Sequence, residues 1–470
     1  MITIPGMKKK SVGVFGLGVS GLATCDALAA SGASVYSFDE SAAAREKTKG
    51  TEYRAEHPKD WPWKELEAIV VSPGVPLTHP APHAIVKKAR IEKKPVIGDT
   101  ELFAFAVNAL PEGARPKVIG VTGSNGKSTT TALIGHMLKE AGEDVSVGGN
   151  IGEAVLSLPE PAKGRTYVLE LSSFQLDLTF SLRLDAAVFL NLSPDHIDRH
   201  GSIEGYYKAK KRIFRNQTKD DAAIVGVDDA FGERLCTELL AGGAPDVIPV
   251  SAQATLGRGV YVLDGAVYVN LDGKTARAGS LEGAHALRGV HNHQNAAAAI
   301  AAASRAGVSP PIALKAAERF TSLPHRMEEI ARIGKTVFVN DSKATNAAAA
   351  ARSLSAFTDI FWIVGGRPKE GGLADLEDTL GGVRKAYLIG EAADDFAKQL
   401  KGKVETEKCG ALEKAVAAAR RDAAASDASA PVVLLSPACA SYDQFKNFEV
   451  RGEAFRAAVD DLQKADGEAA

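Results

Sequence analysis

Short hydrophobic runs rich in β-branched residues recur along the chain, and most are followed by a Gly-rich turn and a helix-like stretch. SVGVF at 11–15, VIGV at 118–121 and DIFWIVGG at 359–366 have the composition of buried strands. Strands that alternate with Ala-rich helices predict parallel or mixed sheets with helices on both faces. The chain is therefore expected to belong to the α/β class, and its 470 residues leave room for several domains.

Residues 11–40 predict a strand, a turn, a helix closed by Gly32 and a second strand. Gly16, Gly18 and Gly21 match the GxGxxG spacing, and Asp39 follows at the expected acidic position. This spacing favours a diphosphate at a helix N-terminus and a sugar hydroxyl or polar ring near the aspartate. NAD and a UDP-sugar offer the same groups, so the residues leave both open.

Two further strands are expected in the same region. VVSPGVP at 70–76 predicts a strand that ends in a turn at Ser72, Pro73 and Gly74. PVIGDTELF at 95–103 predicts a strand that leaves the first domain.

VIGVTGSNGKSTT at 118–130 predicts a strand, a Gly-rich turn and a helix from Lys127 to about Lys139. Such a turn directs backbone N–H groups at an anion on a helix N-terminus. Lys127 would contact the terminal phosphates and Ser128 a Mg²⁺ ion. The strict Walker pattern has a glycine where this chain has Val121. The alternative is a turn without a ligand, which leaves the Lys-Ser-Thr sequence unexplained.

Three more expected strands deliver polar residues at their carboxyl ends, where ligands of open α/β sheets bind. They are DVSVGGNIG at 144–152, YVLELSSFQL at 167–176 and AAVFLNLSPDHIDRHGS at 186–202. Glu170 on an apolar strand is either a rare buried carboxylate or a metal ligand, because a buried carboxylate without a cation is costly. His196 and Asp198 would ordinarily belong to a solvated loop, but their place at this edge favours a second Mg²⁺ site.

The later chain repeats the α/β pattern. Residues 222–289 are expected to complete the central sheet and include a hairpin at VYVLDGAVYVNLDG. Asn292 and Asn295 fall in the first turns of the next helix, where an asparagine is often only a cap. A third domain is expected to begin near TSLPHR at 321–326, with TVFVN at 336–340 as its first strand. AYLIG and PVVLL follow as further strands.

Composition adds limits on function. A formal net charge of -2 gives no electrostatic reason to expect nucleic acid or an anionic membrane surface as a partner. The four cysteines have no CxxC spacing, as expected of thiols in a reducing compartment. The N-terminus lacks the apolar core of a signal peptide, and the Ala-rich run at 296–303 is too short to span a bilayer. A cytoplasmic enzyme acting on small molecules is expected.

Several separated motifs occur in one order along the chain: GLGVSG, TGSNGKST, LELSSFQL, HNHQNA, DSKATN and SPACASYDQFKNFE. In these motifs the chain resembles the Mur ligase family, and within it the D-glutamate-adding members. The resemblance covers essentially the whole chain. It implies a Rossmann-like UDP-sugar-binding domain at 1–98, a central P-loop-type ATP-binding domain at 99–322 and a Rossmann-like amino-acid-binding domain at 323–470.

The resemblance implies an ATP-dependent amide ligase of cytoplasmic peptidoglycan precursor synthesis. Its substrates would be ATP, UDP-N-acetylmuramoyl-L-alanine and D-glutamate, joined through an acyl phosphate and a tetrahedral intermediate. A monomer with no nucleic-acid or membrane partner is expected. The alternatives are a sister ligase of the Mur or folylpolyglutamate type, an NAD-dependent oxidoreductase, which leaves TGSNGKST unexplained, and a non-catalytic nucleotide-binding regulator.

The resemblance also implies roles for individual residues. Substrate would be held in the first two domains by Gly18, Val19, Ser20, Asp39, Glu40, Ser72, Gly74, Asn150 and His196. ATP would be held by Gly123, Ser124, Asn125, Gly126, Lys127, Ser128, Thr129, Asn292, Asn295, Arg326 and Asp341. D-glutamate would be held by Lys343, Thr345, Lys369, Ser441 and Phe448.

Two Mg²⁺ sites are implied, with Ser128 and Glu170 at one and His196 and Lys210 at the other. The basic helix at 203–214 would usually present a solvated face, but in most Mur ligases one lysine of this helix is carbamylated by CO₂. The YxxxKxRI pattern aligns that lysine with Lys210, with Lys211 as the alternative register. The register of Lys369 is also open, because RPKEGG here differs from the family pattern after Gly366.

Overall fold

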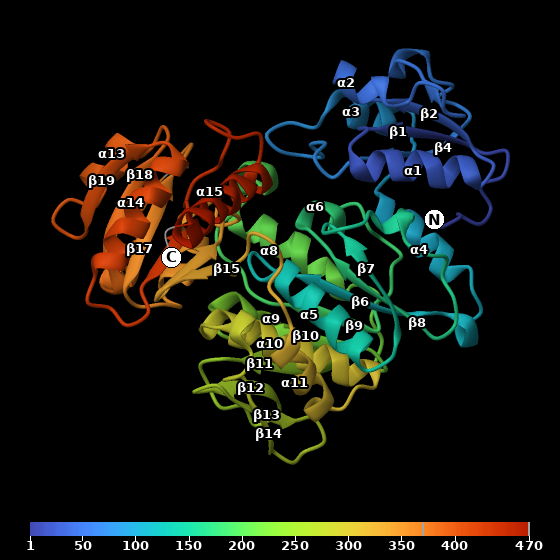
Figure 1. The fold of residues 1–470 in the computed structure, drawn as a ribbon. Helices are drawn as coiled ribbons and strands as arrows, with labels where there is room; N and C mark the ends of the chain where they lie inside the picture. The colour runs from blue at the N-terminus through green and yellow to red at the C-terminus, as the bar shows by residue number, and fades with distance from the viewer. Residues whose placement is uncertain (369–370, 469–470) are drawn as a thin grey trace. The chain divides into compact units, whose positions relative to one another are not determined.

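The computed structural model describes residues 1–368 and 371–468, so Lys369 lies outside the described residues. The chain forms two compact units. Unit 1 comprises Met1–Gly283 with His293–Glu318, and unit 2 comprises Ala284–Asn292 with Arg319–Ala470. Unit 1 contains a five-stranded and a nine-stranded sheet, and unit 2 a six-stranded sheet (Figure 1). The expected α/β class is confirmed.

The first sheet is parallel, with strand order β3-β2-β1-β4-β5. The chain first adds β2 and β3 on one side of β1 and then crosses to add β4 and β5 on the other side. The GLGVSG turn after β1 therefore lies at a topological switch point, where α/β sheets bind ligands. Its strands are β1 (Ser11–Phe15), β2 (Ser34–Phe38), β3 (Arg54–Ala55), β4 (Leu66–Val71) and β5 (Val96–Ile97). Its helices are α1 (Val19–Ala30), α2 (Ala42–Glu46) and α3 (Ala84–Ile91), with η1 (Pro58–Asp60) between them.

The second sheet has the order β14-β13-β12-β11-β10-β9-β6-β8-β7 and is parallel from β7 to β12. The expected hairpin is confirmed, because β12 and β13 pair antiparallel. The strands are β6 (Lys117–Thr122), β7 (Asp144–Gly149), β8 (Arg165–Glu170), β9 (Ala186–Phe189), β10 (Ala222–Gly226), β11 (Asp246–Ser251), β12 (Gly259–Leu263), β13 (Ala266–Asn270) and β14 (Ala276–Ser280). The helical segments are α4 (Asp99–Asn108), η2 (Glu112–Ala114), α5 (Lys127–Glu140), η3 (Val155–Ser157), α6 (Ser173–Leu176), α7 (Ile197–His200), α8 (Ile203–Lys211), η4 (Arg212–Phe214), α9 (Ala230–Gly242), η5 (His285–Leu287), α10 (Val290–Ala306) and α11 (Pro310–Arg319).

The third sheet has the order β15-β16-β20-β17-β18-β19, and every pair except β15 with β16 is parallel. Its strands are β15 (Glu328–Ile333), β16 (Thr336–Asn340), β17 (Ile360–Gly365), β18 (Val383–Ile389), β19 (Glu405–Gly410) and β20 (Val432–Leu435). Its helical segments are α12 (Ala347–Leu354), η6 (Ala374–Gly382), α13 (Ala393–Gln399), α14 (Leu412–Ala425) and α15 (Phe448–Glu468).

Two strands were predicted too long. The strand expected at 95–103 ends at Ile97, and α4 begins at Asp99 with two acidic residues in its first turn, which the helix dipole favours. The strand expected at 167–176 ends at Glu170, because Ser172 and Gln175 form a capping box that starts α6.

Two strands of the third sheet were missed. TVFVN is not the first strand of unit 2, because β15 precedes it. The sequences of β15, EEIARI, and β19, ETEKCG, are rich in charge. Both strands lie at edges of the sheet, where strands often carry charged residues. Their sequences therefore lack the hydrophobic pattern from which the other strands were predicted.

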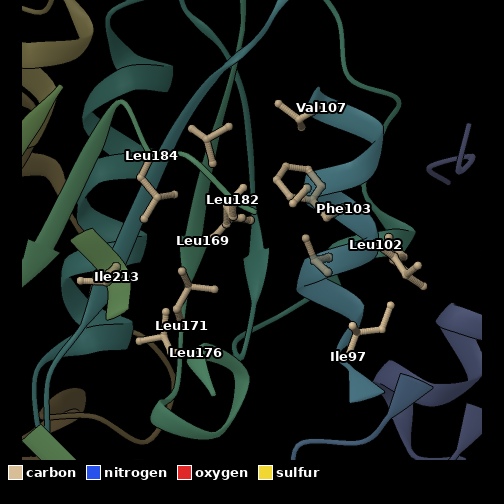
Figure 2. Packing of buried hydrophobic residues seen from close by; sticks show 14 of the residues in the cluster. Ile97, Leu102, Phe103, Val107, Leu169, Leu171, Leu176, Leu182, Leu184 and Ile213 are labelled. Carbon is tan, nitrogen blue, oxygen red and sulfur yellow. The ribbon is translucent and has the colours of Figure 1, made fainter. Parts of the chain in front are cut away.

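A continuous hydrophobic core joins the first two sheets of unit 1. Figure 2 shows Phe103 of α4 and neighbouring apolar side chains facing Leu169 of β8. The same cluster contains Val12 of β1 and Tyr167 of β8, both nearly or fully buried. This shared core joins the two sheets in one compact unit. No helix among the described residues is long and apolar enough to cross a membrane.

Candidate active site

The phosphate loop connects β6 to α5 as the sequence predicts. Gly126 caps α5 in the left-handed conformation at φ 82°, which glycine adopts without strain. The Lys127 ammonium donates to the carbonyl oxygens of Gly123 and Ser124 at 2.9 and 3.0 Å. A Cβ atom at Gly126 would lie 2.2 Å from Asn295 Oδ1, so the predicted asparagine of α10 packs directly on the loop.

Asn191 and Ser193, which follow β9, hold the phosphate loop in place. The sequence analysis did not select either residue. Asn191 Oδ1 accepts from the Asn125 backbone N–H at 2.9 Å, and Asn191 Nδ2 donates to the Asn125 carbonyl at 3.2 Å. The Ser193 backbone N–H donates to Ser124 Oγ at 3.0 Å. The signal for these roles is their position after a strand that neighbours β6.

Glu170 ends β8 opposite Val121 of β6 and is 2% exposed. Asn150 Nδ2 donates to Glu170 Oε1 at 2.7 Å. The other oxygen, Oε2, is buried and has no hydrogen bond among the described residues. A buried carboxylate oxygen without a donor fits a cation, and oxygen ligands suit Mg²⁺. Asn150, predicted to bind substrate, is in the structure the residue that orients this carboxylate.

Lys210 is 1% exposed on α8, in contrast to the solvated face usual for a basic helix. Its ammonium donates to the Gly123 carbonyl at 2.7 Å and lies 4.6 Å from the centre of the Tyr206 ring. Burial lowers the pKa of Lys210 well below its ordinary value, and nearby Lys127 lowers it further. The Asp195 and Glu170 carboxylates oppose this pKa shift.

His196 caps α7 in the left-handed conformation at φ 53°, and its side chain is 47% exposed. Its ring packs on Phe174 at 4.9 Å and on Tyr206 at 6.0 Å, measured between ring centres. Tyr206 therefore joins His196 to Lys210, and its hydroxyl lies 3.3 Å from Ser124 Oγ of the phosphate loop. The structure thus brings His196, Lys210 and the loop to one sheet edge.

Ser128 lies in the first turn of α5 and is buried. Within residues 1–368 and 371–468, no group of three or more histidine, cysteine, aspartate or glutamate side chains could hold a metal ion by itself. A metal here would therefore need a hydroxyl, a modified lysine, water or substrate oxygens among its ligands.

The predicted diphosphate site of the first sheet has an open turn. A Cβ at Gly18 or Gly74 would meet no atom within 4 Å, whereas one at Gly16 would lie 2.4 Å from Ser72 Oγ. Val19 is exposed. The two turns are joined because Ser72 Oγ donates to the Gly16 carbonyl at 3.1 Å.

Asp39, by contrast, is already engaged by backbone. One of its carboxylate oxygens accepts from the Leu17 N–H at 2.6 Å and the other from the Ser41 N–H at 2.7 Å. Glu40 Oε1 lies 3.1 Å from His83 Nε2, a residue that the sequence analysis did not select. Asp39 therefore shapes the GLGVSG turn.

In unit 2 the DSKATN turn follows β16. Asp341 accepts from Ser353 Oγ and from the Met327 backbone N–H, and burial raises the pKa of its carboxyl to about 7. The Lys343 ammonium lies 3.9 Å from the centre of the Phe448 ring. Ser441 is buried. Arg326 lies near enough to Asp341 to oppose the rise of its pKa.

Arg451 of α15 was missed by the sequence analysis. Its buried guanidinium donates to the Ser342 carbonyl at 2.8 Å and twice to the Cys439 carbonyl at 3.1 Å. It also donates to Ser342 Oγ at 3.0 Å. This one side chain joins the turn after β16 to the turn after β20.

A phosphate loop beside a buried glutamate and a buried lysine, on an α/β scaffold, defines an ATP-dependent enzyme, and the comparisons with known proteins give its class as an amide ligase. The Mur ligase middle domain matches residues 121–303, and the Mur ligase glutamate ligase domain matches residues 325–439. The chain belongs to the Mur ligase family.

Full-length relatives agree. The UDP-N-acetylmuramoylalanine--D-glutamate ligase of Caulobacter vibrioides is 52% identical over 470 residues, with 100% of both chains covered. The protein of the same name from Phenylobacterium zucineum is 51% identical, with 100% of this chain and 99% of the relative covered. The crystal structure of a Thermotoga maritima UDP-N-acetylmuramate-alanine ligase matches the fold with a TM-score of 0.58 at 18% identity, covering 97% of this chain and 99% of that one. A pseudomurein peptide ligase type C from Methanothermus fervidus matches with a TM-score of 0.57 at 17% identity, covering 97% of this chain and 100% of that one.

Proposed function

We propose that this protein uses ATP to join D-glutamate to the carboxylate of UDP-N-acetylmuramoyl-L-alanine, giving an amide, ADP and phosphate. The names of its full-length relatives support the choice of substrates. The structural observation that carries the chemistry is the buried, unpaired Glu170 oxygen at the end of β8, the strand beside the phosphate loop. A cation site beside a phosphate-binding loop serves phosphoryl transfer, and the NAD-dependent oxidoreductase alternative leaves this combination unexplained.

The chemistry requires activation of a carboxylate, because an amine does not displace a carboxylate oxygen at neutral pH. The substrate carboxylate attacks the γ-phosphorus of ATP, the bond to the ADP oxygen breaks, and an acyl phosphate forms. The loop N–H groups and Lys127 would bind the phosphates and lower the barrier by positioning and charge neutralisation. The amine of D-glutamate then attacks the acyl carbon and gives up a proton to solvent. The C–O bond to phosphate breaks in the tetrahedral intermediate, and phosphate leaves.

Ser128 and Glu170 would hold one Mg²⁺, and His196 with a modified Lys210 a second. When bound, Mg²⁺ supplies positive charge that offsets the repulsion between substrate carboxylate and phosphate. Asn150 keeps Glu170 oriented for this task through its hydrogen bond.

Lys210 would act as a carbamate. The neutral amine attacks CO₂, a C–N bond forms, and the proton leaves to solvent, so the side chain becomes an anionic oxygen ligand. The low pKa that burial gives Lys210 favours the neutral, nucleophilic amine. Lys211, the alternative, is half-exposed and pairs with Glu238 at 2.5 Å, which favours Lys210.

Unit 2 would contribute the amino-acid and further nucleotide contacts. We propose that the D-glutamate carboxylates are bound by Lys343, Thr345, Ser441 and the Phe448 backbone. Lys369, which lies outside the described residues, is proposed as a further cation. Arg326 and Asp341 would contact the ATP phosphates and ribose. Asn292 and Asn295 of α10, of which Asn295 belongs to unit 1, would contact the adenine. The proposal also includes three domains, at 1–98, 99–322 and 323–470. The protein is proposed to be a monomer and to act in the cytoplasm.

The deciding experiment measures phosphate release from ATP with Mg²⁺ and UDP-N-acetylmuramoyl-L-alanine, adding D-glutamate, L-glutamate or neither. Release that depends on D-glutamate, with an amide product, supports the proposal. Release with a different amino acid moves the protein to a sister ligase activity. No release with any amino acid, together with NAD binding to the first sheet, would replace the proposal by the oxidoreductase alternative.

A further inference from the structure

Helix α7 of the second sheet contacts the turn that follows β4 of the first sheet, within unit 1. Arg199 Nη2 donates to the Pro73 carbonyl at 3.0 Å and also to the Val75 carbonyl. These residues are 126 and 124 positions away from Arg199 along the chain. A single guanidinium group therefore binds both carbonyls of a turn predicted to hold the UDP end of the substrate.

The Arg199 side chain is firmly placed. Its guanidinium carbon lies 5.1 Å from the centre of the Phe174 ring, which favours a cation on its face. Its Nε is buried and has no hydrogen bond among the described residues. Arg199 is partly buried, and the part of its guanidinium that loses water is compensated by the bonds to the two carbonyls.

A second contact joins the same helix to the same loop independently of Arg199. Gly201 ends α7 at φ 76°, and a Cβ there would lie 2.6 Å from Nε2 of His79. The His79 ring and the C-terminal end of α7 are therefore in close contact, and a side chain at position 201 would displace the ring and strain the backbone at φ 76°.

The contact between α7 and the turn after β4 joins two parts of the proposed site. The turn at Ser72 is closed by the Val75 N–H bond to the Ser72 carbonyl at 2.9 Å and is joined to the GLGVSG turn through Ser72 Oγ. At the other end, Arg199 lies three residues after His196, the residue that caps α7. A shift of the first-sheet turn must therefore act on the helix that presents His196.

We propose that Arg199 is a positioning residue that fixes the Ser72–Val75 turn against α7, so that the UDP end of the substrate is bound at a set distance from the phosphate loop. This inference rests on the proposed function, because it assumes a UDP-sugar at the first sheet. Arg199 does not touch the reacting atoms, and its effect is on substrate binding.

The test compares wild type with Arg199→Met and Arg199→Lys by calorimetric titration with UDP-N-acetylmuramoyl-L-alanine, and separately with Mg-ATP. We expect Arg199→Met to bind the UDP-sugar about tenfold to a hundredfold more weakly, because two hydrogen bonds from a charged donor are lost. Arg199→Lys, which can still reach one carbonyl, should show an intermediate loss. Affinity for Mg-ATP should stay at the wild-type value. In turnover, KM for the UDP-sugar should rise more than kcat falls.

Arg215→Met is the matched control, because Arg215 also lies over an aromatic ring, at 5.8 Å from Phe180, and is exposed with no contact to the turn. It should bind both ligands like wild type. If Arg199→Met does not fold, Gly201→Ala tests the same contact from the other side. It should weaken UDP-sugar binding, and His79→Ala added to it should restore part of the affinity.

Equal binding of the UDP-sugar by wild type and Arg199→Met would overturn the inference alone. An equal loss of UDP-sugar and Mg-ATP affinity would also overturn it, since that result indicates general damage to unit 1. Wild type that binds no UDP-sugar would instead overturn the proposed function, and this inference with it.

Discussion

The ammonium of Lys210 donates to the carbonyl of Gly123 at 2.7 Å, so the last turn of α8 meets the first residue of the phosphate loop inside the protein. The two residues are 87 positions apart in the chain. An amine buried at this point is costly as a cation, and Lys127 nearby adds to the cost. Burial therefore favours the neutral form of Lys210, at a position beside the phosphate loop.

If Lys210 becomes a metal-binding carbamate, Lys210→Ala should lower ligase activity by at least about a hundredfold. Short carboxylic acids in the buffer should restore part of the activity, because they can occupy the space of the carbamate. Lys208→Ala, which removes an exposed lysine of the same helix, should act like wild type. Undiminished activity of Lys210→Ala would remove the residue from the site.

Gly126→Ala should abolish detectable ATP binding while the protein remains folded. The new Cβ would lie 2.2 Å from Asn295 Oδ1, and φ 82° disfavours any side chain. Gly142→Ala is the control at the other end of α5, with φ 84° but no atom within 4 Å of its Cβ. It should cost about 1 kcal/mol of stability and leave ATP binding intact. ATP titrations of both variants separate steric damage at the loop from backbone strain.

His200 should make unit 1 less stable in acid. Burial lowers the pKa of its imidazole to about 4 in the folded chain, from 6.5, and nearby His196 and Lys210 add to the shift. Between pH 6.5 and 4 the unfolded chain thus binds a proton that the folded chain excludes, so stability is full above pH 6.5 and falls below it. The side chain is only 4% exposed, and the loss reaches at most about 3 kcal/mol.

Calorimetric melting from pH 7 to 4 tests this prediction. His200→Gln should flatten the pH dependence of the melting temperature, whereas His285→Gln, at an exposed position of unit 2, should retain the wild-type slope. Identical slopes for wild type and His200→Gln would contradict the prediction.

Arg451→Met should destabilise unit 2 by about 3 kcal/mol or more, because the Ser342 and Cys439 carbonyls lose a buried charged donor. Arg456→Met, on the same helix, removes a partly exposed pair with Glu328 and should cost about 1 kcal/mol or less. Calorimetry of the full-length variants provides the measurement. A melting temperature of Arg451→Met equal to that of Arg456→Met would show that the two turns are held by other contacts.

The sequence by itself determined the local units of this protein. The strand, Gly-rich turn and helix at 118–139 and the hairpin of β12 and β13 follow from residue types within a few positions of one another, and the structure confirms them. Two strands predicted from the sequence extended into α4 and α6. The apolar residues of these segments are compatible with a helix as well as with a strand. It also missed β15 and β19, whose charged residues suit sheet edges.

Only the tertiary structure decided which distant residues meet. Strand order placed β9 and β8 on either side of β6, and this brought Asn191 and Glu170 to the phosphate loop. Burial of Lys210 and the bonds of Arg199 to the turn after β4 depend in the same way on segments far apart in the chain. The period of a helix or strand fixes which face a residue occupies, but what packs on that face is set by sheet topology. For that reason the motifs of this chain indicated its chemistry, and the fold alone showed how their side chains are held.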